Sequence, residues 1–191
     1  EIDYIIHCGF ARSSEPSNLV DSINFTTELV KQSSISKIKG FIHISSQSVY
    51  DAQRKEPATE DDVPKPNSKY GLAKYCCERI VESNLEKHNI QFTNLRLGSL
   101  TGENFTYRLT HRIVKSLIND VSININGKGN QVISYLEGRV AADMIISLID
   151  YDQWSTIYNI GSSNSYTLSE IANTIISVGS KYGYKGLLNI E

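Results

Sequence analysis

Methionine is nearly absent from this sequence: Met144 is the only one among 191 residues, and the first residue is Glu1. Because translation starts at methionine, we expect the complete protein to contain residues upstream of Glu1. The chain start also lacks a basic segment followed by an apolar one, so no signal peptide is visible. The apolar runs are far shorter than the roughly 20 residues of a membrane-spanning helix, so we expect no membrane partner.

Cysteine is scarce, and its three positions do not suit a disulfide framework. Cys76 and Cys77 are adjacent, and Cys8 makes the count odd. This pattern favours a reducing compartment, and we expect a cytoplasmic protein. The four histidines lack metal-ligand spacing, so no metal site is expected. The 19 Lys and Arg nearly balance the 21 Asp and Glu, which gives no reason to expect a nucleic acid as partner.

Short apolar segments alternate with helical patterns along the first hundred residues, and this alternation predicts βαβ units with a parallel sheet. After Gly98 the segments become shorter and more varied, with a turn expected at residues 127–130. Asn67 or Ser68 is a candidate N-cap, and Thr167 with Glu170 fits a capping box. The expected strands are residues 4–8, 40–45, 92–97 and 156–160, and the expected helices are residues 19–32, 68–88, 107–119, 140–150 and one from 168.

Tyr70 and Lys74 form the pair with the clearest chemistry. Their i, i+4 spacing puts a phenol and an ammonium on one face of a helix. A nearby ammonium favours the phenolate and lowers the tyrosine pKa from about 10, so such a tyrosine can exchange a proton with a substrate oxygen. Ser46, at the end of an upstream strand, could bind the same oxygen. With 11 tyrosines in the chain the spacing also arises by chance, and the alternative is a packed Tyr beside a solvated Lys.

Longer segments around this pair resemble a known family. Residues 44–50, Ile-Ser-Ser-Gln-Ser-Val-Tyr, resemble a strand end of the extended short-chain dehydrogenases/reductases, specifically the NAD-dependent epimerase/dehydratase family of nucleotide-sugar enzymes. Residues 60–74, which end in Tyr-Gly-Leu-Ala-Lys, resemble its tyrosine–lysine segment. Other segments that resemble family motifs, in the family's order, are residues 3–11, 95–102, 129–136, 158–161 and 168–172. The resemblance therefore covers nearly the whole chain.

The resemblance implies an α/β fold with a Rossmann-like doubly wound parallel sheet, incomplete at its N-terminus, and a small α/β substrate lobe. It implies that residues 1–100 and 140–161 form a partial Rossmann NAD(P)-binding domain. Residues 101–139 and 162–191 would then form a partial substrate-binding lobe.

A glycine-rich turn after the first strand, which would hold a dinucleotide pyrophosphate, is absent near the N-terminus. The family carries this turn two βαβ units earlier, roughly 60 residues at about 30 each. We therefore expect it upstream of Glu1, and we expect the substrate lobe to continue beyond Glu191. The 191 residues alone are expected to have little or no activity.

The resemblance also implies roles for individual residues. Tyr70 would be the acid/base, Lys74 its partner and a ligand of the nicotinamide ribose, and Ser46 the hydrogen-bond partner of the substrate oxygen. Ser48 and Ser99 fall where substrate contacts are expected. The expected cofactor-binding residues are Cys8, Gly9, Phe10, Arg12, Asn24, Tyr70, Lys74 and Gly98. The cofactor would be NAD or NADP, with NAD favoured.

Departures from the family pattern narrow the reaction. Gln47 and Ser48 stand where family dehydratases carry an Asp-Glu pair, and neither can act as a general acid or base, so a dehydratase is disfavoured. Ile133 stands where epimerases often have an Arg that clamps the diphosphate, which weakens the case for a standard nucleotide-diphosphate sugar. The usual Asp is missing from residues 137–140, and Asp51 replaces a Gly.

The sequence therefore favours an NAD(P)-dependent sugar-nucleotide epimerase or ketoreductase. Two alternatives stay open: a non-catalytic dinucleotide-binding or scaffold protein on the same fold, and a reductase of a non-sugar carbonyl. The expected partner is a nucleotide-sugar substrate. By analogy with the family, a homodimer is possible through the helices expected at residues 19–32 and 68–88.

Overall fold

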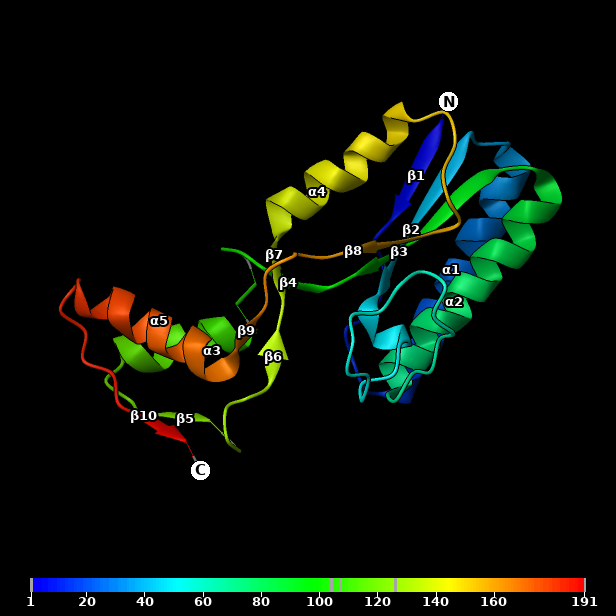
Figure 1. The fold of residues 1–191 in the computed structure, drawn as a ribbon. Helices are drawn as coiled ribbons and strands as arrows, with labels where there is room; N and C mark the ends of the chain where they lie inside the picture. The colour runs from blue at the N-terminus through cyan, green and yellow to red at the C-terminus, as the bar shows by residue number, and fades with distance from the viewer. Residues whose placement is uncertain (1, 104, 107, 126, 191) are drawn as a thin grey trace. The chain divides into compact units, whose positions relative to one another are not determined.

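Four parallel strands form the main sheet of the computed structural model, which describes residues 2–103, 105–106, 108–125 and 127–190 (Figure 1). Their order in the sheet is β1-β2-β3-β8. The strands are β1 (Tyr4–His7), β2 (Gly40–Ser46), β3 (Gln91–Leu97) and β8 (Ile157–Ile160). Because all three pairings are parallel, the carboxyl ends of the strands meet at one edge of the sheet. The predicted parallel sheet is confirmed.

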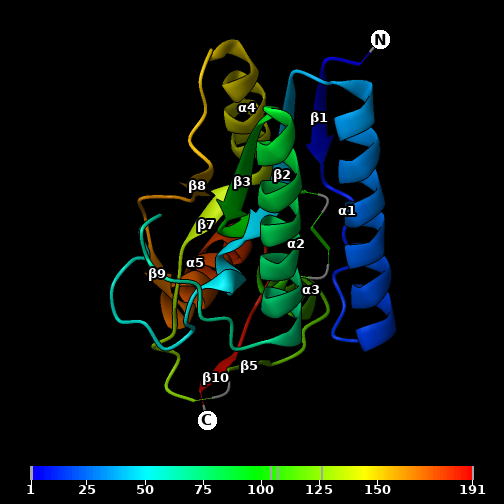
Figure 2. The same cartoon turned by 90° about the vertical axis from the view of Figure 1, so that its right-hand side faces the viewer.

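Two long helices, α1 (Pro16–Ser36) and α2 (Lys69–Leu85), provide the crossovers from β1 to β2 and from β2 to β3. They lie side by side against the sheet (Figure 2). Their apolar faces and the strand residues that point toward them form one core. Its buried members are Val30, Ile38, Phe41, Val81, Leu85, Ile90 and Phe92.

The helix ends follow local chemistry. Helix α1 begins at Pro16, three residues earlier than the expected start at residue 19, because the fixed φ of proline suits the first turn of a helix. Ser68 caps α2 by accepting a hydrogen bond from the Gly71 N–H at 3.0 Å, as one of the two predicted caps requires. The predicted extension to His88 is a separate 3₁₀ turn, η2 (Glu86–His88). A further 3₁₀ turn, η1 (Gln47–Val49), follows β2 directly.

The chain divides into two compact units, Glu1–Gly98 with Asp143–Ile160 and Ser99–Ala142 with Gly161–Glu191. The expected domain boundaries differ from these by at most three residues. Helix α4 (Gly138–Ser147) runs from the second unit into the first, and the 3₁₀ turn η3 (Leu148–Asp150) follows it.

The second unit contains short strands in pairs and two helices. Strands β4 and β7 are parallel, β5 and β10 are parallel, and β6 and β9 are antiparallel. Helices α3 and α5 pack over β5 with a core that includes Ile113, Leu117 and Ala172. The elements are β4 (Ser99–Thr101), α3 (Leu109–Ile118), β5 (Ile123–Ile125), β6 (Val132–Ile133), β7 (Tyr135–Glu137), β9 (Tyr166–Thr167), α5 (Leu168–Ser180) and β10 (Leu188–Ile190).

Two local predictions for the second unit are confirmed. Gly127 and Gly129 have φ values of 75° and 66°, the left-handed region that glycine adopts in turns. Thr167 and Glu170 form the complete capping box that opens α5. The helix predicted from residue 107 begins at Leu109, and Tyr107 itself lies outside the described residues.

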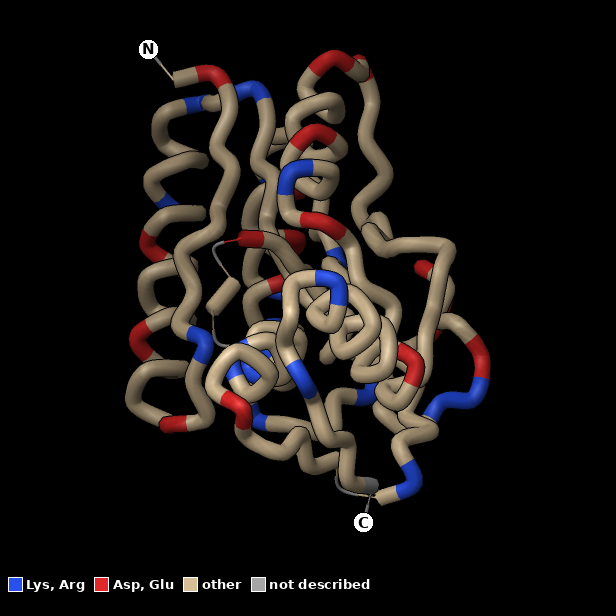
Figure 3. Tube along the Cα trace, turned by 90° about the vertical axis from the view of Figure 1, so that its left-hand side faces the viewer, with Lys and Arg blue, Asp and Glu red and all other residues tan. Residues whose placement is uncertain are grey.

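The described helices fall short of the length and apolarity needed to cross a membrane. In Figure 3, Lys and Arg are interspersed with Asp and Glu along the described trace.

Candidate active site

Several predicted site residues follow the carboxyl ends of neighbouring strands in the first unit. Residues 8–12 follow β1, Ser46 ends β2, and Gly98 follows β3. The Gly98 N–H donates to the Ile160 carbonyl at 2.8 Å, which fixes this chain segment beside the end of β8. This edge of a parallel sheet is where α/β proteins bind ligands.

Gly71 brings the start of α2, and with it Tyr70, against the chain that follows Ser46. A Cβ built on Gly71 would collide with the carbonyl oxygen of Ser48 and approach Pro66, so no other residue allows this contact without a shift. Tyr70 is half-buried there. The Tyr-Gly step of the sequence thus allows a close contact between α2 and η1.

Lys74 lies one helical turn after Tyr70 and is only 3% exposed. Its Nζ donates a hydrogen bond to the carbonyl oxygen of Ile44 at 2.7 Å, two residues before Ser46. Burial lowers the pKa of Lys74 to about 8, although Cys77, Cys8 and Glu78 act in the opposite direction. The helix therefore holds a desolvated ammonium beneath the end of β2.

Phe10 connects the loop after β1 to this pair. The Lys74 Nζ lies over the Phe10 ring, 4.0 Å from its centroid. The same ring meets the ring of Tyr70 edge-on, with centroids 5.7 Å apart and planes at 86°. Phe10, Tyr70 and Lys74 thus form one cluster although they come from distant parts of the sequence.

Ser46 and Ser48 contact each other at the end of β2. The Ser46 hydroxyl lies 3.2 Å from the Ser48 hydroxyl, to which it donates, and it accepts from the Ser48 N–H at 3.2 Å. The latter bond caps η1, so Ser46 has a local structural role as well as its predicted one.

The remaining predicted site residues lie in different parts of the structure. Cys8 and Gly9 are exposed beside Phe10 in the loop after β1. Arg12 and Asn24 are also exposed. Ser99 begins β4 in the second unit, so the structure does not place it relative to this cluster.

Two buried histidines, which the sequence analysis did not single out, lie beneath the cluster. His7 and His43 are register partners on β1 and β2, with ring centroids 5.1 Å apart. Burial and, to a lesser extent, the charge of Lys74 lower the pKa of His7 to about 4. The pKa of His43 is held well below its usual value by burial, then by Lys74 and His7. Lys74 is therefore the charged group here, and the imidazoles are neutral.

Glu78 and Arg96 form a buried pair that was not predicted from the sequence, and their side chains are each 2% exposed. Two signals could have found it. Arg96 interrupts an apolar strand between two leucines, and Glu78 follows Lys74 by four residues on the buried face of α2.

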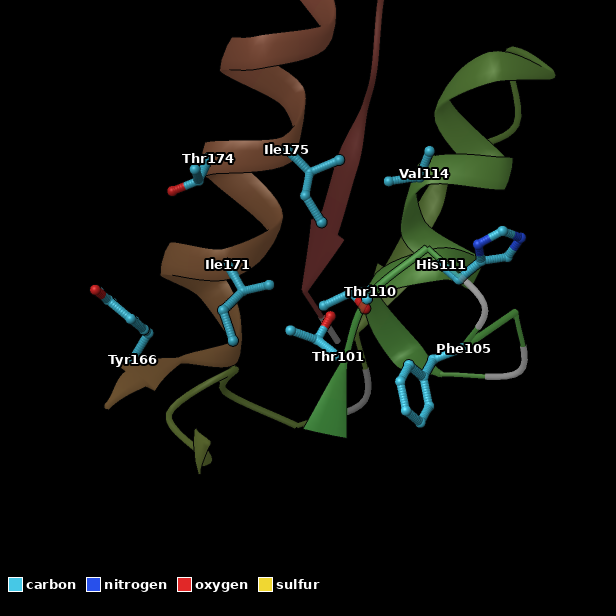
Figure 4. Close-up of a pocket in the computed structure, with 10 residues that line it drawn as sticks. Thr101, Phe105, Thr110, His111, Val114, Tyr166, Ile171, Thr174 and Ile175 are labelled. Atoms are coloured by element: carbon cyan, nitrogen blue, oxygen red, sulfur yellow. The ribbon is translucent and has the colours of Figure 1, made fainter. Parts of the chain in front are cut away.

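The second unit contains a cavity of about 480 Å³ of its own (Figure 4). Val114 of α3 and Ile175 of α5 point into the space between these two helices. Among the described residues, those that line it include no Asp, Glu, Lys or Arg and none of the predicted site residues. The lining residues are Thr101, Gly102, Phe105, Thr110, His111, Val114, Tyr166, Ile171, Thr174 and Ile175.

A parallel sheet with polar side chains at the carboxyl ends of its strands defines a Rossmann-like α/β protein. The chain belongs to the NAD dependent epimerase/dehydratase family, whose sequence model matches residues 1–161. The resemblance seen in the sequence is therefore confirmed, and so is the fold class.

Solved structures similar to this chain are sugar-nucleotide enzymes. UDP-N-acetylglucosamine 4-epimerase from Bacillus cereus matches with a TM-score of 0.86 and 25% identity, over 98% of this chain and 66% of that one. UDP-glucuronic acid 4-epimerase from the same organism, in complex with UDP-glucuronic acid and NAD, matches with a TM-score of 0.87 and 22% identity, over 99% and 62%.

Curated proteins with similar sequences include a dehydratase and a reductase of nucleotide sugars. The dTDP-D-glucose 4,6-dehydratase of Homo sapiens is 20% identical over 186 residues, which are 93% of this chain and 53% of the relative. The dTDP-4-dehydro-6-deoxyglucose reductase of Escherichia coli is 26% identical over 123 residues, 62% of this chain and 39% of the relative. The chain spans between 28% and 61% of the length of the curated relatives it matches.

Proposed function

We propose that the protein containing this chain is an NAD(P)-dependent sugar-nucleotide epimerase or ketoreductase that prefers NAD and uses Tyr70 as its acid/base. One observation carries the proposal: Tyr70 and Lys74 lie against the same Phe10 ring at the carboxyl edge of a parallel sheet. Ser46 ends the strand whose Ile44 carbonyl binds Lys74.

The proposed chemistry is proton transfer at one oxygen. The phenol oxygen of Tyr70 takes the proton of a sugar hydroxyl, or gives a proton to a carbonyl oxygen, while the Ser46 hydroxyl holds that oxygen in place. The ammonium of Lys74 favours the phenolate because opposite charges attract more strongly in a desolvated site. A bound nicotinamide supplies the acceptor and donor of hydride at the same carbon.

The donors present here suit the nicotinamide–ribose part of such a cofactor. An ammonium has three N–H donors, and among the described residues only the Ile44 carbonyl oxygen accepts a hydrogen bond from Lys74. Ribose hydroxyls are suitable acceptors for the others. Residues 8–11, which follow β1, do not form a glycine-rich pyrophosphate turn. Cofactor binding is therefore best tested on the full-length protein.

The choice between reactions rests on Gln47 and Ser48, in the turn that follows β2. An amide and a hydroxyl are poor general acids and bases, which argues against elimination of water and for epimerisation or carbonyl reduction. The similarity to the UDP-N-acetylglucosamine 4-epimerase from Bacillus cereus supports the same preference. We further propose a cytoplasmic location, because the three cysteines are free thiols.

The test is turnover of a panel of nucleotide sugars by the full-length protein and its Tyr70→Phe variant. We expect turnover to fall about 100- to 10 000-fold in the variant, as for loss of a general acid/base, with an unchanged melting temperature. Tyr75→Phe, on the same helix, is the matched control and should keep full activity.

Unchanged turnover in Tyr70→Phe would remove this tyrosine from the mechanism. Cofactor binding without turnover of any sugar nucleotide or small carbonyl would instead favour a non-catalytic dinucleotide-binding protein. Turnover of small carbonyls alone would indicate a reductase of non-sugar substrates.

A homodimer through α1 and α2 is part of the proposal. Both helices expose apolar side chains: Val20 and Phe25 on α1 are 53% and 54% exposed, and Leu72 on α2 is 54% exposed. Sedimentation of the full-length protein at micromolar concentration tests this, and a monomer would contradict it.

A further inference from the structure

The ring of Phe10 occupies the space directly over the ammonium of Lys74. Its centroid is 4.0 Å from Nζ, well within the roughly 6 Å range of a cation–π contact. The same ring touches Tyr70 edge-on. Both residues of the proposed acid–base pair therefore contact one apolar side chain that has no proton to donate or accept.

The backbone next to Phe10 is held, whereas its ring is partly open to solvent. The Ala11 N–H donates to the Ser22 hydroxyl at 3.0 Å, and that hydroxyl donates to the Asn18 carbonyl at 2.8 Å, so the loop is tied to α1. Phe10 is half-buried and lies in a segment outside any helix or strand. A change of side-chain rotamer can therefore move the ring without unfolding the loop.

The ring affects Lys74 in two opposite ways. It lies against a side chain that is only 3% exposed, and such burial disfavours the charged form. Its π face also attracts the ammonium, which offsets part of that cost. The ring covers one face of the ammonium, so a ligand that brings a hydroxyl acceptor to that face takes the place of the ring.

We propose that Phe10 is a removable cover over Lys74, which the ribose of the cofactor displaces when it binds, so that this side chain sets cofactor affinity. The cofactor part of this inference rests on the function proposed above; the cover itself rests on the position of the ring alone. Displacing a cation–π contact should weaken cofactor binding about two- to thirtyfold. Phe10 would then be a positioning residue that acts through Lys74.

The cover can be tested without any cofactor. We would label the full-length protein at pH 8 with an amine-acylating reagent and measure modification of Lys74 by peptide mass spectrometry. Lys69, exposed one turn earlier on α2, serves as the internal reference. Phe10→Ala should label several-fold faster at Lys74 relative to Lys69, while Tyr151→Ala, which removes an exposed aromatic elsewhere in the same unit, should not. Equal Lys74 labelling in Phe10→Ala and wild type would overturn the cover.

Displacement is tested by titrating NAD and NADP into the same variants. Phe10→Ala should bind the preferred cofactor about two- to thirtyfold more tightly than wild type. Phe10→Leu keeps apolar volume but has no π face, so its cofactor affinity should lie between those of wild type and Phe10→Ala. Weaker binding in Phe10→Ala would show that the ring is part of the binding surface and would overturn displacement.

The two proposals can fail separately. Suppose that Lys74 labelling rises in Phe10→Ala, but neither wild type nor Phe10→Ala binds NAD or NADP. The cover over Lys74 then stands, whereas the proposed function and the displacement of the ring by the cofactor are both wrong. If wild type and Phe10→Ala bind the cofactor with equal affinity, the proposed function stands and the proposed displacement of the Phe10 ring is wrong. A circular dichroism melt of each variant shows whether it is folded. If Phe10→Ala is not folded, the labelling of Lys74 is compared between Phe10→Leu and wild type instead.

Discussion

The guanidinium of Arg96 and the carboxylate of Glu78 form a buried ion pair, with Nη2 and Oε2 2.8 Å apart. The Ser45 hydroxyl donates to the same carboxylate at 2.5 Å, and Arg96 donates to the Tyr50 hydroxyl at 2.8 Å. That hydroxyl in turn lies 2.8 Å from the Asn159 Oδ1, to which it donates. The network therefore joins α2 to β2, β3 and β8 within the first unit.

Removing one partner of this pair should be costly. Glu78→Ala leaves the Arg96 guanidinium buried without its counter-charge, so we expect the free energy of unfolding to fall by about 3–5 kcal/mol. Urea unfolding of the full-length protein measures this. Glu82→Ala, which breaks the more exposed pair with Arg79 on the same helix, should cost less than about 1 kcal/mol. Similar losses in both variants would contradict the role given to burial.

Gly71→Ala tests the contact that brings Tyr70 to the end of β2. The added methyl group would meet the Ser48 carbonyl oxygen, which belongs to backbone and can yield little. We expect a loss of about 1–3 kcal/mol in stability, as for overpacking, and lower turnover because Tyr70 shifts. Gly161→Ala is the control, since nothing lies within 4 Å of a Cβ there. A Gly71→Ala melting temperature equal to that of wild type would show that the backbone adjusts freely.

The buried histidines should make stability depend on pH. The pKa of His7 is lowered to about 4 in the fold and that of His43 is also lowered, whereas unfolded histidine titrates near 6.5. As pH falls below 6.5, the unfolded state binds protons that the folded state does not, so stability is lost. His7 should contribute about 2 kcal/mol of this loss between pH 7 and pH 5, and His43 should add to the loss because its pKa is lowered too.

His43→Leu separates the two contributions. Among the described residues neither ring nitrogen of His43 has a hydrogen-bond partner, so we also expect this variant to be more stable than wild type at pH 7, by about 1–2 kcal/mol. Its loss of stability between pH 7 and pH 5 should be smaller than that of wild type, because only His7 of the two then contributes. Unfolding curves at several pH values measure both effects, with the exposed His88→Leu as control. A pH dependence identical to wild type would exclude His43 as a source.

Helix α2 shows which structural features can be predicted from local sequence and which cannot. A cap at Asn67 or Ser68 and the shared face of Tyr70 and Lys74 were predicted, because hydrogen bonding at a helix end and the helical repeat depend only on near neighbours. The start of α1 was placed three residues too late, because the polar residues after Pro16 obscured the first turn. The pairing of Glu78 with Arg96 was missed, because the sequence pattern shows that each is buried but does not identify its partner.

By itself, the sequence determined the alternation of strands and helices, the parallel sheet, and the candidate pair of Tyr70 and Lys74, since these follow from periodicity and from ordered motifs. Only the tertiary structure decided what surrounds that pair. The ring of Phe10 reaches Lys74 across more than 60 residues of chain because parallel pairing of β1 with β2 brings the loop after β1 beside α2. Contacts between distant segments depend on strand register and helix packing, which no local pattern encodes.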